Sequence, residues 1–224
     1  MKDPKLKGTK PARSAERKET RNSCHLPPIA VGVMGSAGGS LSDEILRKVY
    51  RLGQEIAKKG FVLITGACPG LPHEAIKGAK SVGGKTVGIS PALNFREHML
   101  KYKSPCRGYD AIIYTGSGLM GREIENIRSC DIVIFAGGRS GTLGEFAIAY
   151  DEAKVIGVLL GTGGITEKIE TIIQYVDKET GAQVVFDDDP GKLLDRLVEV
   201  YNRVLLPYNL SVLANRNPDG EMEA

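Results

Sequence analysis

The stretch from Gly137 to Glu145 gathers residue types that bind anions and move protons. Its sequence is GGRSGTLGE, between a continuous apolar run at residues 131–135 and a segment with helical spacing at residues 142–152. Glycines at the end of a strand expose backbone N–H groups beside the positive end of the next helix, which suits a phosphate. Thr142 adds a hydroxyl group, and Glu145 adds a carboxylate one turn later. The spacing predicts a phosphate-binding turn; the alternative is a tight turn that only starts a helix.

Arg122 is the second candidate for chemistry, on a helix expected over residues 119–129. A guanidinium group can hold phosphate through two parallel hydrogen bonds or polarise a departing base. The alternative for Arg122 is a surface salt bridge with Glu125 or Asp131. Asn126, one turn later, is an even choice between a ligand contact and a structural role.

Four isolated side chains have weaker signals. Ser36 lies in a glycine-rich stretch at residues 35–40, where it either contacts a phosphate or ribose or only shapes a turn. Cys68 lies in another loop, and an inert thiol is favoured over a substrate contact. His73 and His98 stand alone, and we expect structural or solvated roles for both.

These residues need elements to position them, and the sequence from Pro27 onward alternates between two patterns. Short apolar runs that end in glycine predict strands at residues 29–34, 61–65, 85–89, 110–114, 131–135, 155–160 and 182–186. Apolar residues at helical spacing predict helices at residues 42–59, 72–82, 119–129, 142–152, 167–175 and 190–204. Glycine makes up 28 of 224 residues, above the usual level of about 7%, and most glycines end an apolar run.

The strand runs are continuous and rich in β-branched residues, which is typical of strands buried on both faces of a parallel sheet. We therefore predict an α/β fold, a Rossmann-like three-layer α/β/α arrangement with a mainly parallel sheet of about seven strands. Residues 27–206 form one domain, with an irregular stretch at residues 92–109 and a flexible C-terminal tail at residues 207–224. In such sheets ligands bind outside the carboxyl ends of the strands, where the strand order reverses.

Charge is unevenly distributed along the chain, which carries a formal net charge of +3. Residues 1–22 hold eight basic and three acidic side chains, a net of +5, so the other 22 basic and 24 acidic residues give −2. With few large apolar residues, residues 1–26 are expected to form a disordered basic tail. A nucleic-acid-binding arm is the less favoured interpretation, because this tail has no aromatic residues to stack on bases.

Several classes of protein are excluded by missing patterns. No run of about 20 apolar residues is present, so we expect no membrane span. The four cysteines form no CxxC pair and no zinc-like spacing, which favours free thiols and a cytoplasmic setting, with no metal site. Neither the GxGxxG pattern with a following acidic residue nor the Walker A pattern occurs. A nicotinamide-dependent dehydrogenase and a P-loop NTPase are therefore disfavoured.

The GGRSGTLGE segment resembles the GGxGTxxE signature of the Lonely Guy family, often labelled lysine decarboxylase-like. This family belongs to a wider group with the molybdenum-cofactor carrier proteins and the DprA-like domains. Other stretches resemble the group as well, and the resemblance covers about residues 29–160: MGSAG at residues 34–38, TGACPGLP at 65–72, GGKTVGISP at 83–91 and MGRE at 120–123.

The resemblance implies a Rossmann-like protein that forms a homodimer or higher homo-oligomer. Lonely Guy enzymes hydrolyse the N-glycosidic bond of a nucleoside 5′-monophosphate, releasing the base and ribose 5-phosphate. By resemblance, Arg122 and Glu145 are the catalytic pair, and a carboxylate there would stabilise an oxocarbenium-like transition state or position water. The ligand-binding residues implied are Gly35, Ser36, Gly66, Gly137, Gly138, Ser140, Gly141 and Thr142. Catalysis would require no cofactor, and no lysine context suggests a pyridoxal-phosphate decarboxylase.

Three departures count against a plain Lonely Guy enzyme. The glycine loop is one residue longer, Glu123 replaces a lysine, and Gly144 stands where a second glutamate is common. The longer loop resembles that of the carrier-protein branch. We expect a nucleotide- or phosphate-binding protein with phosphoribohydrolase activity. The alternative is a non-catalytic carrier for the molybdenum cofactor, a pterin, or for a nucleotide. In either case the expected partner is a phosphate-bearing small molecule rather than nucleic acid.

Overall fold

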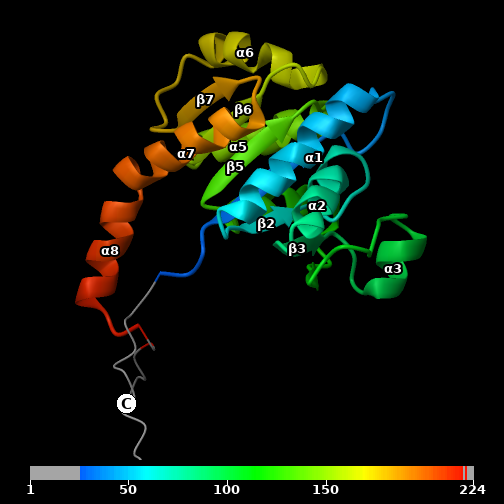
Figure 1. The fold of residues 1–224 in the computed structure, drawn as a ribbon, viewed down its shortest axis with the longest axis horizontal. Helices are drawn as coiled ribbons and strands as arrows, with labels where there is room; N and C mark the ends of the chain where they lie inside the picture. Colours follow the sequence, from blue (N-terminus) through cyan, green and yellow to red (C-terminus); the bar gives the residue numbers. More distant parts are fainter. Residues whose placement is uncertain (1–25, 219, 221–224) are drawn as a thin grey trace, which may run out of the picture.

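The computed structural model describes residues 26–218 and residue 220, and it confirms the predicted fold class. Seven strands form one sheet in the order β4-β3-β2-β1-β5-β6-β7, and every neighbouring pair is parallel (Figure 1). The strands are β1 (Ala30–Gly35), β2 (Val62–Thr65), β3 (Lys85–Ser90), β4 (Ala111–Tyr114), β5 (Ile132–Ala136), β6 (Val155–Leu159) and β7 (Gln183–Asp187).

Helices cover both faces of the sheet and give the three layers. They are α1 (Asp43–Lys58), α2 (Leu71–Ser81), α3 (Phe95–Leu100), α4 (Gly118–Arg128), α5 (Ser140–Asp151), η1 (Gly164–Lys168), α6 (Ile169–Val176), α7 (Pro190–Val204) and α8 (Leu206–Asn215). One buried cluster joins the sheet to α1, α2 and α7, and a second joins it to α4, α5 and α6. Successive strand residues point to opposite faces, so Val33 belongs to the first cluster and Met34 to the second.

The sheet order places a switch point between β1 and β5. The chain adds strands in one direction from β1 to the edge strand β4, and α4 then carries it back to β5 on the other side of β1. The loops that leave β1 and β5 therefore diverge to opposite faces, which opens a crevice at the carboxyl ends of these two strands. The glycine-rich segments predicted to bind ligand both begin there.

Two elements differ from the sequence predictions. The stretch at residues 92–109 contains the short helix α3, whose N-cap Asn94 accepts a hydrogen bond from the backbone of Glu97. A flexible tail was expected from residue 207, but α8 runs from Leu206 to Asn215 and extends away from the sheet (Figure 1). Pro207 does not end the helix because it occupies the first turn, where its missing N–H costs nothing.

The basic tail predicted for residues 1–26 lies, apart from Leu26, outside the described residues. Within the described part of the chain, no helix is both long and apolar enough to cross a membrane.

Candidate functional site

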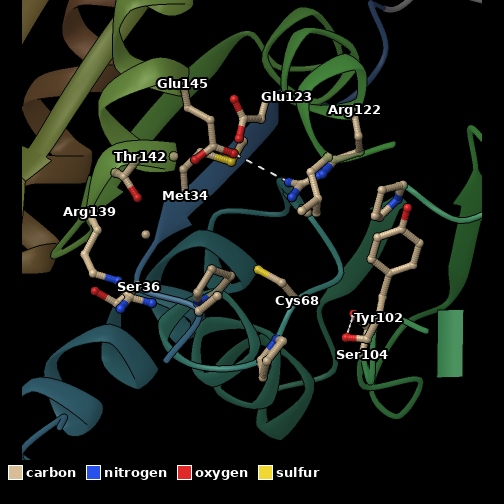
Figure 2. A pocket seen from close by; sticks show the side chains of 18 of the residues that line it. Met34, Ser36, Cys68, Tyr102, Ser104, Arg122, Glu123, Arg139, Thr142 and Glu145 are labelled. Atoms are coloured by element: carbon tan, nitrogen blue, oxygen red, sulfur yellow. Dashed lines mark hydrogen bonds and ion pairs between the residues drawn. The ribbon is translucent and has the colours of Figure 1, made fainter. Parts of the chain in front are cut away.

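A cavity of about 630 Å³ lies at the switch point, at the carboxyl ends of β1, β2 and β5. Its walls come from the loops after β1 and β2, the segment that follows α3, and the N-terminal parts of α4 and α5 (Figure 2). A volume of this size suits one mononucleotide or pterin-sized ligand. Most predicted site residues line it: Gly35, Ser36, Gly66, Arg122, Ser140, Gly141, Thr142 and Glu145.

The N-terminus of α5 presents backbone donors to this cavity. Its N-cap, Arg139, makes no side-chain capping bond, and the first bond of the helix runs from the N–H of Leu143 to the carbonyl of Arg139 at 3.0 Å. The preceding N–H groups, those of Ser140, Gly141 and Thr142, are therefore available to an anion at the positive end of the helix. Arg139 itself lines the cavity and adds a positive charge beside these donors.

Gly137 and Gly138 play a different part from the one implied by the resemblance. Their backbone φ angles are +63° and +96°, a left-handed conformation that favours glycine. The N–H of Gly137 donates to Oγ1 of Thr162 at 2.8 Å, and that of Gly138 donates to Oγ of Ser36 at 2.7 Å. Neither glycine lines the cavity. They hold the shape of the loop that leads into α5, and their N–H groups already have partners.

Arg122 and Glu145 lie together at the bottom of the cavity. Nη1 of Arg122 is 3.5 Å from Oε1 of Glu145, and each residue is only 7% exposed. The surface salt bridge considered for Arg122 is not formed: Glu125 instead accepts a bond from Ser117, and Asp131 accepts one from the backbone of Ala30.

Gly66 at the end of β2 makes room for the guanidinium group. A Cβ atom at this position would overlap Nη1 of Arg122, so the arginine packs directly against the backbone there. Nε of Arg122 is buried without a hydrogen-bond partner among the described residues. The guanidinium group therefore keeps donor capacity for a ligand.

Burial sets the protonation of the groups around Arg122. It raises the pKa of Glu145 to about 7, an effect that the positive charge of Arg122 opposes and the negative charge of Glu123 reinforces. Burial also raises the pKa of Glu123, again opposed by Arg122. The pKa of the Cys68 thiol rises to about 11 for the same reason. Cys68 lines the cavity as a neutral thiol and is a poor nucleophile at neutral pH.

Glu123 is a site residue that sequence reasoning noted only as a departure from the family pattern. It lines the cavity and is 8% exposed. Its Oε1 and Oε2 atoms lie 3.4 Å from where Cβ atoms would stand at Gly141 and Gly144, respectively. The two departures at residues 123 and 144 are therefore neighbours in the structure.

The wall opposite α5 was not predicted. Lys101, Tyr102 and Ser104 follow α3 and line the cavity together with Leu119 from α4 (Figure 2). Sequence reasoning treated this stretch as irregular and assigned it no role. Tyr102 gives the cavity an aromatic side, on the far side from Ser36, Arg139 and Thr142 in the view of Figure 2.

The remaining candidates lie outside the cavity lining. Asn126 donates from Nδ2 to Sδ of Met34 at 2.9 Å, its Oδ1 is buried without a partner among the described residues, and a side-chain hydrogen bond with it lowers the pKa of Glu145. His98 is fully buried, with Nδ1 2.8 Å from Oγ of Ser90 and Nε2 3.1 Å from the carbonyl of Pro105. His73 does not line the cavity. The described residues contain no cluster of three or more metal-ligating side chains.

The fold and the cavity define a Rossmann-like α/β protein with its site at the topological switch point. The chain belongs to the SLOG cluster4 family, whose model matches residues 28–194. The predicted membership of the Lonely Guy-like superfamily, on the side of the molybdenum-cofactor carrier proteins, is confirmed.

Similar proteins include one sequence and two solved structures. An uncharacterized protein of Archaeoglobus fulgidus is 38% identical over 132 residues, 58% of this chain and 80% of that protein. The molybdenum cofactor binding protein of Rippkaea orientalis has a TM-score of 0.65 at 30% identity, covering 79% of this chain and 99% of that one. The molybdenum cofactor carrier protein of Chlamydomonas reinhardtii has a TM-score of 0.62 at 29% identity, covering 77% and 98%.

Proposed function

We propose that this protein binds a phosphate-bearing small molecule, a nucleoside 5′-monophosphate or a phosphorylated pterin, in the cavity at the switch point. The observation that carries the proposal is that the unoccupied donors of α5 and the buried pair of Arg122 and Glu145 line one cavity. The phosphate would be held by Ser140, Gly141 and Thr142, with Ser36 and Arg139 beside them. The ring of the ligand would extend toward Tyr102, where an aromatic face can stack on it.

The same geometry supports hydrolysis of an N-glycosidic bond. With the phosphate at α5 and the ring near Tyr102, the ribose would lie over Arg122 and Glu145. Cleavage develops positive charge on the ribose, so the carboxyl group of Glu145, once it has given up its proton, stabilises the transition state or orients water. The guanidinium group of Arg122 would hold the phosphate or polarise the departing base. No metal or cofactor is needed in this scheme.

The activity is tested by incubating the full chain with a panel of nucleoside 5′-monophosphates and measuring free base by chromatography. We expect release from at least one member and a loss of about 100-fold or more in Glu145→Gln, the typical contribution of a positioned acid or base. Absence of release from every member, with no difference between the two proteins, would overturn the hydrolase proposal.

A non-catalytic carrier is the second candidate, favoured by the likeness to the molybdenum cofactor binding and carrier proteins. It predicts that a phosphorylated pterin or nucleotide stays bound without turnover. Native mass spectrometry and calorimetry with the same compounds distinguish the two candidates. Retention of an intact ligand supports the carrier, and failure to bind any phosphate compound rejects both.

We also propose that the protein forms a homodimer through α4. This helix exposes Leu119, Met120 and Ile124, and Met120 is 77% exposed. Sedimentation equilibrium should give twice the mass of one chain, and Met120→Glu should shift the population toward monomer. A monomeric wild-type protein would contradict this proposal. The cytoplasmic location stays a prediction from the cysteine pattern.

A further inference from the structure

The carboxylate of Glu123 lies beside two glycines on one face of α5. Its two carboxylate oxygens lie against Gly141 and Gly144, which are one turn apart on the same face of α5. Glu123 is 8% exposed, and none of the hydrogen bonds or ion pairs found among the described residues involves its carboxylate. Its carboxylate lines the cavity beside Arg122, and a second carboxylate held close to it is costly unless a proton or a ligand offsets the charge.

Glu145 of α5 is electrostatically coupled to Glu123 of α4, whose negative charge raises the pKa of Glu145. Figure 2 shows them side by side, with the dashed ion pair to Arg122 drawn from Glu145. The charged or titratable groups coupled to Glu145 are Arg122 and Glu123 from α4, Cys68 from the loop after β2 and Cys130 after α4. Both thiols are neutral at pH 7, because burial raises the pKa of each.

One guanidinium group therefore faces two carboxyl groups. Two ionised carboxylates beside a single buried cation would leave an uncompensated negative charge, which burial makes unfavourable. The shifts agree with this picture, because burial and the charge of Glu123 both raise the pKa of Glu145, and burial raises the pKa of Glu123 as well.

We propose that Glu123 is a positioning residue that keeps a proton on Glu145 near neutral pH, so that the cavity offers its ligand a carboxylic acid. This inference rests on the proposed function and narrows its ligand. Beside the ribose, the ligand atom that meets the carboxyl group of Glu145 must accept a hydrogen bond, as a ring nitrogen or a carbonyl oxygen does and an ammonium group does not.

The proton has a defined path if the ligand is a nucleoside 5′-monophosphate. As the C1′–N bond breaks, its electron pair stays on the base, and the ring nitrogen takes the proton from Glu145. Water then adds to C1′ and returns one proton to the ionised Glu145. The sum is one water consumed, with base and ribose 5-phosphate released. For a retained pterin, the same acid donates a hydrogen bond to a ring acceptor without breaking a bond.

The test is an NMR titration of the side-chain carboxyl carbons in ¹³C-glutamate-labelled full chain without ligand. The signal of Glu145 is assigned by its disappearance in Glu145→Gln. We expect its midpoint to fall by about one pH unit in Glu123→Gln, because a like charge is removed from its side. Glu125→Gln is the matched control: it removes a carboxylate from the same helix outside the cavity, and the midpoint should not move.

An unchanged midpoint in Glu123→Gln would overturn the proposal, since a merely structural role for Glu123 does not alter the titration of Glu145. If Glu123→Gln fails to fold, Glu123→Asp is the second variant. It keeps the negative charge but moves the carboxyl group away from Glu145, so we expect the midpoint of Glu145 to fall by less than about one pH unit. The titration needs no ligand. A shifted midpoint in a protein that binds no phosphate compound would therefore reject the proposed function while leaving the positioning role in place.

Discussion

At the scale of single residues, the cavity depends on a glycine that leaves room for a charged side chain. Gly66 accommodates the guanidinium group of Arg122, because a Cβ there would overlap Nη1. At Gly141 and Gly144 a Cβ would stand 3.4 Å from the carboxylate of Glu123, which is an ordinary contact. The position of Arg122 is therefore set by the backbone after β2 as much as by α4 itself.

We predict that Gly66→Ala displaces Arg122 with little effect on stability. The new Cβ would meet the flexible end of one side chain, and Gly66 has no left-handed backbone conformation that would add strain. Ligand affinity should fall by about 10-fold, equal to roughly 1.4 kcal/mol, while the free energy of unfolding changes by less than about 1 kcal/mol. Calorimetry with the best-bound nucleotide and urea unfolding measure the two effects.

Gly38→Ala is the matched control, because a Cβ at Gly38 meets nothing within 4 Å. The effects of Gly66→Ala and Arg122→Ala should not add, since both remove the same guanidinium contact. Full additivity in the double variant would show that Gly66 acts in some other way.

At the scale of elements, the loop between β5 and α5 is held by hydroxyl groups from two other loops. Ser36 follows β1 and Thr162 follows β6, and they accept the N–H groups of Gly138 and Gly137. Thr162 also donates to the carbonyl of Leu159 at 2.6 Å. Three strand ends are thereby connected at the cavity.

Ser36→Ala should lower the free energy of unfolding by about 1–3 kcal/mol, because it leaves the N–H of Gly138 without its acceptor. Ser140→Ala, which removes an exposed hydroxyl group at the start of α5, should change it by less than about 0.5 kcal/mol. Urea unfolding without ligand compares the two variants. Equal stabilities would show that the bond between Ser36 and Gly138 contributes nothing to the loop.

Sequence patterns predicted all seven strands and the longer helices α1, α2, α4, α5, α6 and α7, because continuous apolar runs and helical spacing are local signals. The short helix α3 was missed, since six residues are too few to show a period. Helix α8 was missed because residues 207–224 were predicted to be a flexible tail, although the proline at its start is compatible with a first turn. Arg122 and Glu145 were found through the motif, whereas the role of Tyr102 depends on how the segment after α3 folds over the cavity.

At the scale of the whole molecule, the buried Glu145 links stability to pH. Its pKa rises from 4.5 to about 7 on folding, so the folded protein binds this proton more tightly than the unfolded chain does. The bound proton therefore adds to the free energy of unfolding. This contribution is fully present below pH 4.5 and is lost as the pH rises toward 7. The size of the effect is about 3 kcal/mol, from about 1.4 kcal/mol per pH unit.

Glu145→Gln should therefore match wild type in stability near pH 4 and exceed it by about 3 kcal/mol at pH 7, because glutamine resembles the protonated side chain. Urea unfolding at several pH values between 4 and 8 tests this, with Glu125→Gln as the control. A Glu145→Gln protein less stable than wild type at pH 7 would show that the ionised pair with Arg122 outweighs the cost of burial.

The hydrogen bonds that the N–H groups of Gly137 and Gly138 make without ligand affect the expected kinetics of binding. Their loop takes its shape from Ser36 and Thr162, so an arriving anion has no segment to fold and little conformational entropy to remove. Association is then expected to occur in one step, with an observed rate that rises linearly with ligand concentration and does not saturate. Differences in affinity between related ligands would accordingly arise in their dissociation rates.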